Sequence, residues 1–461
     1  MKIILCYLNL ARRRFFPVGV TMLVNELVAH NHDVKIFDIS FYEGIGEDID
    51  EKRRRLRFYK SIEDVIPIKL KKTNPLEDLK RHVKEFNPGL VGFSALSIDF
   101  SLAKTLAKVV KEEDPTTITI LGGIHATVAP EECILEDCFD IICIGEGEIA
   151  LTKLAKSIEN GTDYSHIDNL WVKNTGGIVK NKVHSFRKLD ELPTPDWEPF
   201  DPQHIWGALY GKMYRMAPVE LSRGCPYRCT YCVNDSLRNI YDSGKNYHRR
   251  KTPEKAIEDM LYLKEKYNIE MFYILDEAFL AMKNTELQRL SELYRKKINT
   301  PFFSQTRAET VTDEKAKIIA EMGCEVISMG IENGNEEIRR TVLHRNVSNE
   351  QIIKAFKTMQ KYGIKVSSFN MLGVPGETKK TILETIELNR LCKPDSIGVS
   401  YFFPYKGTSL RNLAIKEKMI TGNEDPSLAN EKPVLDLPTI SKEEIIHFYE
   451  HFVEYCTNRN G

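Results

Sequence analysis

The sequence has almost no net charge and no long apolar run. Its 65 Lys and Arg residues balance 66 Asp and Glu residues, which gives a formal charge of −1 at pH 7. We therefore expect neither nucleic acid nor a membrane surface as a partner, since both attract strongly basic chains. No segment approaches the ~18 consecutive apolar residues of a membrane span. The start, MKIILCYLNLA, lacks the charged leading segment and cleavage site of a secretion signal, so we expect a strand there.

Cysteine is also scarce, with ten in 461 residues. That is too few for a disulfide scaffold, and three of the ten lie within residues 225–232. Such a group indicates metal-binding thiolates in a reducing compartment, so we expect a cytoplasmic protein. No tandem repeat or low-complexity tract interrupts the chain. Apolar residues make up 42% of it, and its length suits about three folding units of ~150 residues.

The first 155 residues alternate apolar β runs with helical spacers. The β runs lie at 2–8, 33–39, 89–95, 117–123 and 140–145. Continuous apolar strands separated by helices are typical of a parallel sheet covered on both faces. We therefore predict a doubly wound, Rossmann-like α/β domain at 1–155, with ligands at the carboxyl ends of its strands. Residues 41–75 are charged and irregular, apart from a short helix expected at 51–57.

The alternation stops at residues 156–205, which we interpret as a linker. LWVKNTGGIVKN predicts a hairpin around Gly176–Gly177 within it. Residues 206–410 hold six further β runs separated by helical patterns, at 217–221, 270–275, 301–306, 325–331, 364–373 and 396–403. Six units are too few for a closed eight-unit barrel, so we predict a partial (β/α)6 TIM barrel with its chemistry at the carboxyl strand ends. A helical extension at 411–461 includes a helix that Ser441 and Glu444 cap.

The strongest signal is LSRGCPYRCTYCVND, just after the first of these six β runs. Cys225, Cys229 and Cys232 form a C-x3-C-x2-C motif, which supplies three thiolates from one loop. A cubane iron–sulfur cluster is normally held by four cysteines, so three leave one iron open for a ligand from outside the protein. The alternative is zinc, which needs a fourth Cys or His. His248 is the nearest later candidate, but the loop lacks paired C-x2-C halves.

This loop and the motifs behind it resemble those of the radical S-adenosylmethionine (SAM) enzymes, over about residues 215–410. The family's segments have counterparts, in order, in LDEAF (275–279), the strand end at Arg307, GIENGN (330–335), NMLGVPGET (370–378) and PYKGTSL (404–410). Each segment alone has an ordinary structural explanation. Their order behind the cysteine motif favours a functional one.

The resemblance implies a [4Fe–4S] cluster on the three cysteines, with SAM bound to the open iron and cleaved to a 5′-deoxyadenosyl radical. It places Tyr231 beside the adenine. It places Asp276 and Glu277 near the SAM amino group, and Arg307 at the SAM carboxylate, where a guanidinium fork suits a planar anion. An external electron donor such as flavodoxin or ferredoxin is implied as a partner.

The later motifs imply further contacts to SAM. Glu332, in GIENGN, corresponds to the residue that holds the ribose hydroxyls. Asn370 and Gly373 belong to the segment whose backbone approaches the adenine. Hydrogen abstraction needs no side-chain base, so we assign no catalytic acid or base.

The first block has no G-x-G-x-x-G, so a nicotinamide site is not expected. FFPVGV (15–20), LGGIHATVAPEE (121–132) and IGEGE (144–148) each follow a β run and should meet at one sheet edge. The set resembles the cobalamin-binding domain of one large branch of radical SAM enzymes, over about residues 1–155. The resemblance implies cobalamin contacts from strand-end residues: Ser94, Gly122, Gly123, His125, Ala126, Thr127, Gly145, Glu146 and Gly147.

Two other metal arrangements are less favoured. Many cobalamin proteins bind cobalt through the His of a D-x-H-x-x-G motif, which this sequence lacks. His125 in GGIHAT fits an orienting contact or an ordinary loop histidine better than a cobalt ligand. A second cluster built from Cys133, Cys138 and Cys143 is conceivable by count. However, Cys143 lies within a β run and is expected to be a small apolar residue.

The resemblance implies an enzyme that methylates an unactivated carbon, or less often phosphorus, of a small molecule through methylcobalamin. One alternative keeps the cofactors but ends in cyclisation, ring contraction or oxidation without methyl transfer. Another is a non-catalytic zinc- or corrin-binding protein. A nucleic-acid substrate would use the basic run at 238–250, with Arg249, Arg250 and the adjoining Lys251, but the overall charge does not support it.

Overall fold

The computed structural model describes residues 1–46, 48–56, 58, 61–62, 65–184, 186–241 and 247–457. The chain forms two compact units. The first comprises Met1–Ile49, Ile66–Trp206 and Ser236–Tyr247, and the second comprises Asp50–Val65, Gly207–Asp235 and His248–Gly461. Across the described ranges, no helix has both the length and the apolar character needed to cross a bilayer.

The first unit is built on a seven-stranded sheet in the order β2-β1-β3-β4-β5-β6-β7. The five predicted β runs are confirmed as parallel strands: β2 (Asp33–Asp38), β1 (Lys2–Tyr7), β3 (Leu90–Ser94), β4 (Ile118–Gly122) and β5 (Ile141–Cys143). The strand order reverses between β1 and β3, and doubly wound domains bind ligands at such a switch point. The predicted hairpin is also present, as β6 (Leu170–Asn174) and β7 (Gly177–Lys180), and it extends this sheet antiparallel to β5.

Helices cover this sheet, and their ends follow local sequence signals. They are α1 (Val18–Ala29), α3 (Pro75–Phe86), α4 (Phe100–Glu113), α5 (Ile124–Val128), α6 (Pro130–Leu135) and α7 (Glu148–Asn160). Asn74 caps α3 by accepting a hydrogen bond from the Leu76 amide, and Pro75 occupies the first helical position. Leu79 of α3 and Leu106 of α4 are fully buried in the core beneath β1, β3 and β4.

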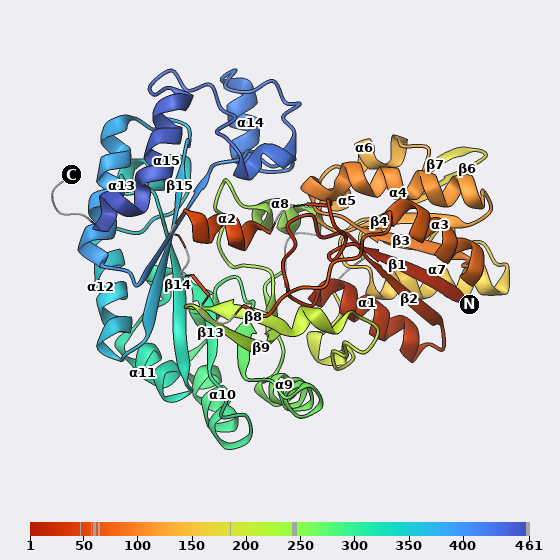
Figure 1. The fold of residues 1–461 in the computed structure, drawn as a ribbon, viewed down its shortest axis with the longest axis horizontal. Helices are drawn as coiled ribbons and strands as arrows, with labels where there is room; N and C mark the ends of the chain where they lie inside the picture. The colour runs from red at the N-terminus through yellow and green to blue at the C-terminus, as the bar shows by residue number, and fades with distance from the viewer. Residues whose placement is uncertain are drawn as a thin grey trace. The chain divides into compact units, whose positions relative to one another are not determined.

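The second unit is a curled, open sheet in the order β16-β15-β14-β13-β12-β9-β8 (Figure 1). Its strands are β8 (Trp206–Leu209), β9 (Lys212–Val219), β12 (Met271–Ile274), β13 (Phe302–Thr306), β14 (Cys324–Glu332), β15 (Lys365–Leu372) and β16 (Ser396–Tyr401). The six strands from β9 to β16 pair in parallel, which confirms the predicted partial barrel. A short ribbon, β10 (Ser222–Arg223) with β11 (Arg249–Arg250), follows the first of them.

The barrel helices lie on the convex side of this sheet (Figure 1). They are α9 (Pro253–Tyr267), α10 (Asn284–Lys297), α11 (Asp313–Glu321), α12 (Asn349–Lys361) and α13 (Lys379–Cys392). Further helices are α8 (Val233–Ile240), a π-helical turn at Ile338–Val342, α14 (Ser409–Lys416) and α15 (Lys442–Thr457). The predicted capping box of α15 is confirmed, because the backbone amides of Ser441 and Glu444 each donate to the other residue's side chain.

The concave face of the barrel sheet carries aromatic side chains. Ser368 Oγ donates to Asn389 Oδ1 of α13 at 2.7 Å, so Ser368 faces the helices. Phe369, the next residue, faces the concave side and keeps 38% of its surface exposed. Tyr273 of β12 and Phe303 of β13 stack with ring centroids 4.2 Å apart on the same face, as the strand register requires.

The charged segment around residue 50 belongs to the second unit, although it lies within the first 155 residues. The expected short helix is present as α2 (Ile49–Arg55), and residue 57 of its expected range lies outside the described residues. Phe58 is 2% exposed and packs edge-on against Tyr449 of α15, with ring centroids 5.4 Å apart. Ser396 Oγ of β16 donates to the Phe58 carbonyl at 3.0 Å. Aromatic burial therefore joins this segment to β16 and α15.

Candidate active site at the carboxyl ends of the strands

The cysteine loop runs from β10 to α8. Cys225 and Cys229 are buried, and Cys232 is half-buried. The loop is tied to the rest of the unit by backbone bonds of Thr230, whose amide donates to the Leu343 carbonyl at 3.3 Å. Burial raises the pKa of the Cys225 thiol to about 11 and also raises the pKa of Cys232. A bound iron offsets that cost, because metal ligation favours the thiolate.

Within the described part of the chain, no three His, Cys, Asp or Glu side chains converge as a site for a single metal ion requires. His248, the candidate fourth zinc ligand, lies with Nε2 3.4 Å from Arg250 Nη2. Its ring is thus directed at a guanidinium group.

Asp276 and Glu277 point in different directions at the end of β12. Asp276 is fully buried, and its Oδ1 accepts from the amides of Leu221 and Ser222 at 2.9 Å each. Its Oδ2 accepts from Arg250 Nη1 at 2.8 Å. Asp276 therefore anchors the strand that leads into the cysteine loop. Glu277 is exposed on the side of the cysteines.

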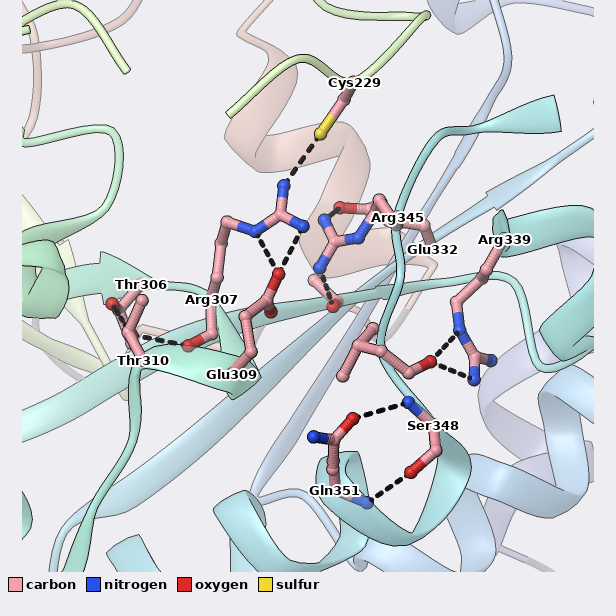
Figure 2. A network of polar contacts seen from close by, with 12 residues as sticks. Cys229, Thr306, Arg307, Glu309, Thr310, Glu332, Arg339, Arg345, Ser348 and Gln351 are labelled. Atoms are coloured by element: carbon pink, nitrogen blue, oxygen red, sulfur yellow. Dashed lines mark hydrogen bonds and ion pairs between the residues drawn. The ribbon is translucent and has the colours of Figure 1, made fainter. Parts of the chain in front are cut away.

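Arg307, at the end of β13, is directed at a predicted metal ligand. Its Nη1 donates to Cys229 Sγ at 2.8 Å, and its Nε donates to Glu309 Oε1 at 2.7 Å (Figure 2). The guanidinium also lies 3.8 Å from the ring centroid of Tyr227. A buried cation beside a thiolate stabilises negative charge there, whether on sulfur or on a carboxylate ligand.

Glu332 ends β14 at a register shift and has a left-handed backbone, with φ +65°. Its Oε1 accepts from Arg345 Nη1 at 3.0 Å and from the Tyr231 hydroxyl at 3.3 Å. Arg345 Nη2 also donates to the Gly330 carbonyl at 2.8 Å. The site thus holds a half-buried, salt-bridged carboxylate one strand away from Arg307.

Asn370 and Gly373 lie on and just after β15. The Asn370 side chain is buried and donates to the Gly398 carbonyl at 2.9 Å while accepting from Asn389. The Gly373 amide donates to Glu377 Oε2 at 2.5 Å. Glu377 is fully buried and also accepts from Asn333, and burial raises its pKa to about 8. Asn370 therefore has its hydrogen bonds within the sheet, and Gly373 is fixed by Glu377.

Three polar residues of the site were not predicted from the sequence: Glu309, Arg345 and Glu377. Glu377 falls inside the quoted NMLGVPGET segment, and Glu309 lies two residues beyond Arg307. Arg345 follows a π-helical turn and belongs to no quoted motif. Only the folded chain brings it to Glu332 (Figure 2).

Two cations, Arg250 of the basic run at 238–250 and its neighbour Lys251, form ion pairs with carboxylates. Arg250 is paired with Asp276, as described above. Lys251 Nζ lies 2.7 Å from Asp259 Oδ2, and both side chains are almost fully buried. Residues 242–246 lie outside the described residues. Each of these two cations therefore already has a carboxylate partner.

The strand-end residues of the first unit fall into two groups. Ser94, Gly122, Gly123, Gly145, Glu146 and Gly147 are half-exposed at the carboxyl edge of the sheet. The other three residues of the predicted cobalamin set are buried: His125, Ala126 and Thr127. The half-exposed group is the one that a ligand can reach.

The buried residues, His125 to Thr127, pack behind the half-exposed ones and fix their backbone. Thr127 Oγ1 donates to the Gly123 carbonyl at 2.8 Å and accepts from the Gly145 amide at 3.0 Å, which joins two of the predicted segments. His125 packs on Phe100 with ring centroids 4.2 Å apart, and its Nδ1 lies 3.1 Å from Ser97 Oγ. The ring of His125 is therefore fixed within the first unit by Phe100 and Ser97.

A Gly123→Ala substitution is expected to destabilise the first unit by about 2 kcal/mol or more. Gly123 has φ +92°, and an added Cβ would lie 2.7 Å from the Ala95 carbonyl oxygen. Gly122→Ala is the control, because its Cβ would make only an ordinary 3.7 Å contact with Cys143 Cβ. Thermal unfolding and cobalamin retention would be measured for both. Equal losses in the two variants would contradict the expectation.

Comparisons with known proteins agree with this geometry. Residues 219–388 match the sequence model of the Radical SAM superfamily, and residues 6–155 match that of the B12 binding domain. The Uncharacterized methyltransferase PH0819 of Pyrococcus horikoshii is 26% identical over 93% of this chain and 85% of its own. The anaerobic magnesium-protoporphyrin IX monomethyl ester cyclase of Rubrivivax gelatinosus is 23% identical over 73% of this chain and 61% of its own.

The fold is also found among solved structures. That of the radical SAM methyltransferase TsrM from Kitasatospora setae, with cobalamin and a [4Fe–4S] cluster bound, superposes with a TM-score of 0.68. The match covers 90% of this chain and 78% of TsrM at 16% identity.

The fold and the cysteine site define a radical SAM enzyme. More narrowly, the chain belongs to the cobalamin-binding branch of that superfamily, and its cofactors are a [4Fe–4S] cluster, SAM and cobalamin. The described residues fit these groups. Three cysteines share one loop beside a buried guanidinium, a carboxylate lies on the neighbouring strand, and half-exposed glycines line the edge of the first sheet.

Proposed function

We propose that this enzyme methylates an unactivated carbon, or less often a phosphorus, of a small-molecule substrate. The observation that carries the proposal is the combination within one chain of a B12-binding domain with the cysteine–arginine–glutamate site of the radical SAM unit. One compared relative and the solved TsrM structure are named as methyltransferases, which supports the same reaction class.

In this proposal the protein's own residues bind the cluster and SAM and orient them. Cys225, Cys229 and Cys232 hold the cluster. Arg307 turns from Cys229 to the SAM carboxylate, and the exposed Glu277 receives the SAM amino group. When bound, the cluster and SAM supply a 5′-deoxyadenosyl radical, and cobalamin supplies the methyl group.

The remaining predicted SAM contacts are assigned by their place in the site. We assign the Glu332 carboxylate to the ribose hydroxyls and the Gly373 backbone to the approach of the adenine, with the Tyr231 ring beside it. Asn370 supports β15 through its bonds within the sheet.

The substrate is proposed to pack on the concave face of the barrel sheet. Phe369 is exposed there, and the stacked pair of Tyr273 and Phe303 lies on the same face of the sheet. These rings exclude water around a radical and suit an apolar part of the substrate. An external one-electron donor such as flavodoxin or ferredoxin is the proposed protein partner, and a reducing cytoplasm suits the free cysteines.

Anaerobic purification with cobalamin supplied is expected to give about four irons and one cobalt per chain. Turnover of SAM with a reductant and a small-molecule extract would then be followed by chromatography. S-adenosylhomocysteine formed together with 5′-deoxyadenosine supports methyl transfer. Iron without cobalt would remove the cobalamin-dependent reaction, and zinc without iron would overturn the radical SAM assignment.

One alternative is favoured by a specific observation, since a compared relative is named as a cyclase. A cyclase of this kind would release 5′-deoxyadenosine without S-adenosylhomocysteine. The same chromatogram therefore separates the two reactions.

A further inference from the structure

Arg345 is a buried arginine that the proposed reaction does not use. Its side chain is 4% exposed, and it lies in the loop between the π-helical turn and α12. Its Nη1 donates to Glu332 Oε1 at 3.0 Å and to the Tyr231 hydroxyl at 3.1 Å, and its Nη2 donates to the Gly330 carbonyl. One guanidinium group thus connects the cysteine loop, the end of β14 and a carboxylate.

Arg339, six residues earlier, shows what a purely structural arginine does here. It is fully buried, and all three of its nitrogens donate to oxygens, among them the carbonyls of Asn333 and Val347. Figure 2 shows the two bonds that Arg339 donates to one carbonyl oxygen. Arg345 differs, because its buried Nε has no hydrogen-bond partner among the described residues. An unsatisfied buried donor is costly, so the orientation of Arg345 is set by its contacts with Glu332 and Tyr231.

The backbone is shaped to bring Glu332 to this arginine. Glu332 adopts φ +65°, which costs energy for a residue with a side chain. A Cβ on residue 330 would lie 2.0 Å from Glu332 Oε1 and 3.1 Å from Arg345 Nη1, so a side chain there would displace the Glu332 carboxylate from its present position. The Glu332 side chain therefore folds back over Gly330.

The two oxygens of Glu332 are not equivalent. Oε1 accepts from both Arg345 and Tyr231, whereas Oε2 has no hydrogen-bond donor in the described ranges. The side chain keeps 13% of its surface exposed. Burial raises the pKa of this carboxyl, and the charge of Arg345 is the first of the effects that oppose it. One oxygen is thus held by the protein and the other is left for a ligand.

We propose that Arg345, together with Tyr231, is a positioning residue that keeps Glu332 ionised with Oε2 directed at the two ribose hydroxyls of SAM. Arg345 itself does not touch SAM. This positioning role rests on the proposed function, which supplies SAM as the ligand. It adds the residue that orients the Glu332 carboxylate for binding the ribose. One open carboxylate oxygen has enough lone pairs to accept from both hydroxyl groups, and its negative charge strengthens these hydrogen bonds.

The test measures SAM affinity in the anaerobic, cluster-reconstituted full chain. Dissociation constants for SAM and for its 2′-deoxy and 3′-deoxy analogues would be determined by equilibrium dialysis. Wild-type protein is expected to prefer SAM over the deoxy analogues by about tenfold. Arg345→Met is expected to weaken SAM about tenfold and to lose that preference, while Arg345→Lys recovers part of it. Tyr231→Phe should fall between wild type and Arg345→Met.

Cluster measurements and a control variant distinguish a lost ribose contact from general damage to the protein. Iron content and the EPR signal of the reduced cluster are expected to match wild type in every variant, since no cysteine is changed. Arg339→Met is the matched control: it should lower the melting temperature and retain the preference for the ribose. A preference that persists in Arg345→Met would overturn the positioning role. A wild-type protein that does not bind SAM would instead overturn the proposed function.

Discussion

Replacing Cys229 by alanine is expected to reduce the iron content from about four atoms per chain to below one. Two thiolates on a loop cannot hold a cubane that normally needs four. The loss also removes the sulfur that Arg307 contacts at 2.8 Å, so a buried cation is left without that partner. Iron and sulfide analysis after anaerobic reconstitution, with the visible spectrum, is the measurement. SAM cleavage should fall to background in the same samples.

The control for this experiment is Cys392→Ala. Cys392 ends α13 and is also buried, at 1% exposure against 7% for Cys229, but it lies outside the cysteine loop. Its variant should keep the full iron content and the wild-type spectrum. If both variants lost iron alike, the loss would reflect general instability and the loop would not be the cluster site.

Asp276→Ala is expected to destabilise the second unit by about 3–5 kcal/mol, because it breaks a buried pair by removing one partner. Arg250 would keep its charge without the carboxylate 2.8 Å away, and the amides of Leu221 and Ser222 would lose their acceptor. These amides lead into the cysteine loop, so cluster occupancy should fall along with stability. Denaturant unfolding and iron content of the same preparations would be measured.

The neighbouring carboxylate supplies the comparison. Glu277→Gln changes an exposed side chain and should alter stability by no more than about 0.5 kcal/mol, while weakening SAM binding. The opposite pattern, with Asp276→Ala stable but unable to bind SAM, would return Asp276 to the SAM-binding role that the sequence motif suggests.

The sequence was sufficient for the strand framework of both sheets. Runs such as those that became β3 and β14 are apolar and bounded by turn residues, so local patterning alone locates them. The cysteine motif and each of the later motifs are also short segments, so each could be recognised from its own residues. The division of labour between Asp276 and Glu277 was not predictable, because adjacent residues at a strand end share a motif but point to different surroundings.

Long-range pairing explains the other omissions. Arg345 reaches Glu332 and Tyr231 across 13 and 114 residues of sequence. Nothing in its own neighbourhood marks it. Phe58 was treated as part of an irregular segment, because its packing partner Tyr449 lies almost four hundred residues further on. Such contacts form only in the folded topology, so no local sequence pattern predicts them.

The packing of Phe58 has a consequence for how the polypeptide can be divided and how it matures. A fragment that stops near residue 206 would expose Phe58 to water, since Tyr449 and β16 would be missing. The B12-binding unit produced without the barrel is therefore expected to aggregate less when residues 50–65 are removed. During synthesis, the same residues must wait for α15 to emerge from the ribosome, so closure of the barrel's outer layer is a late event in biogenesis.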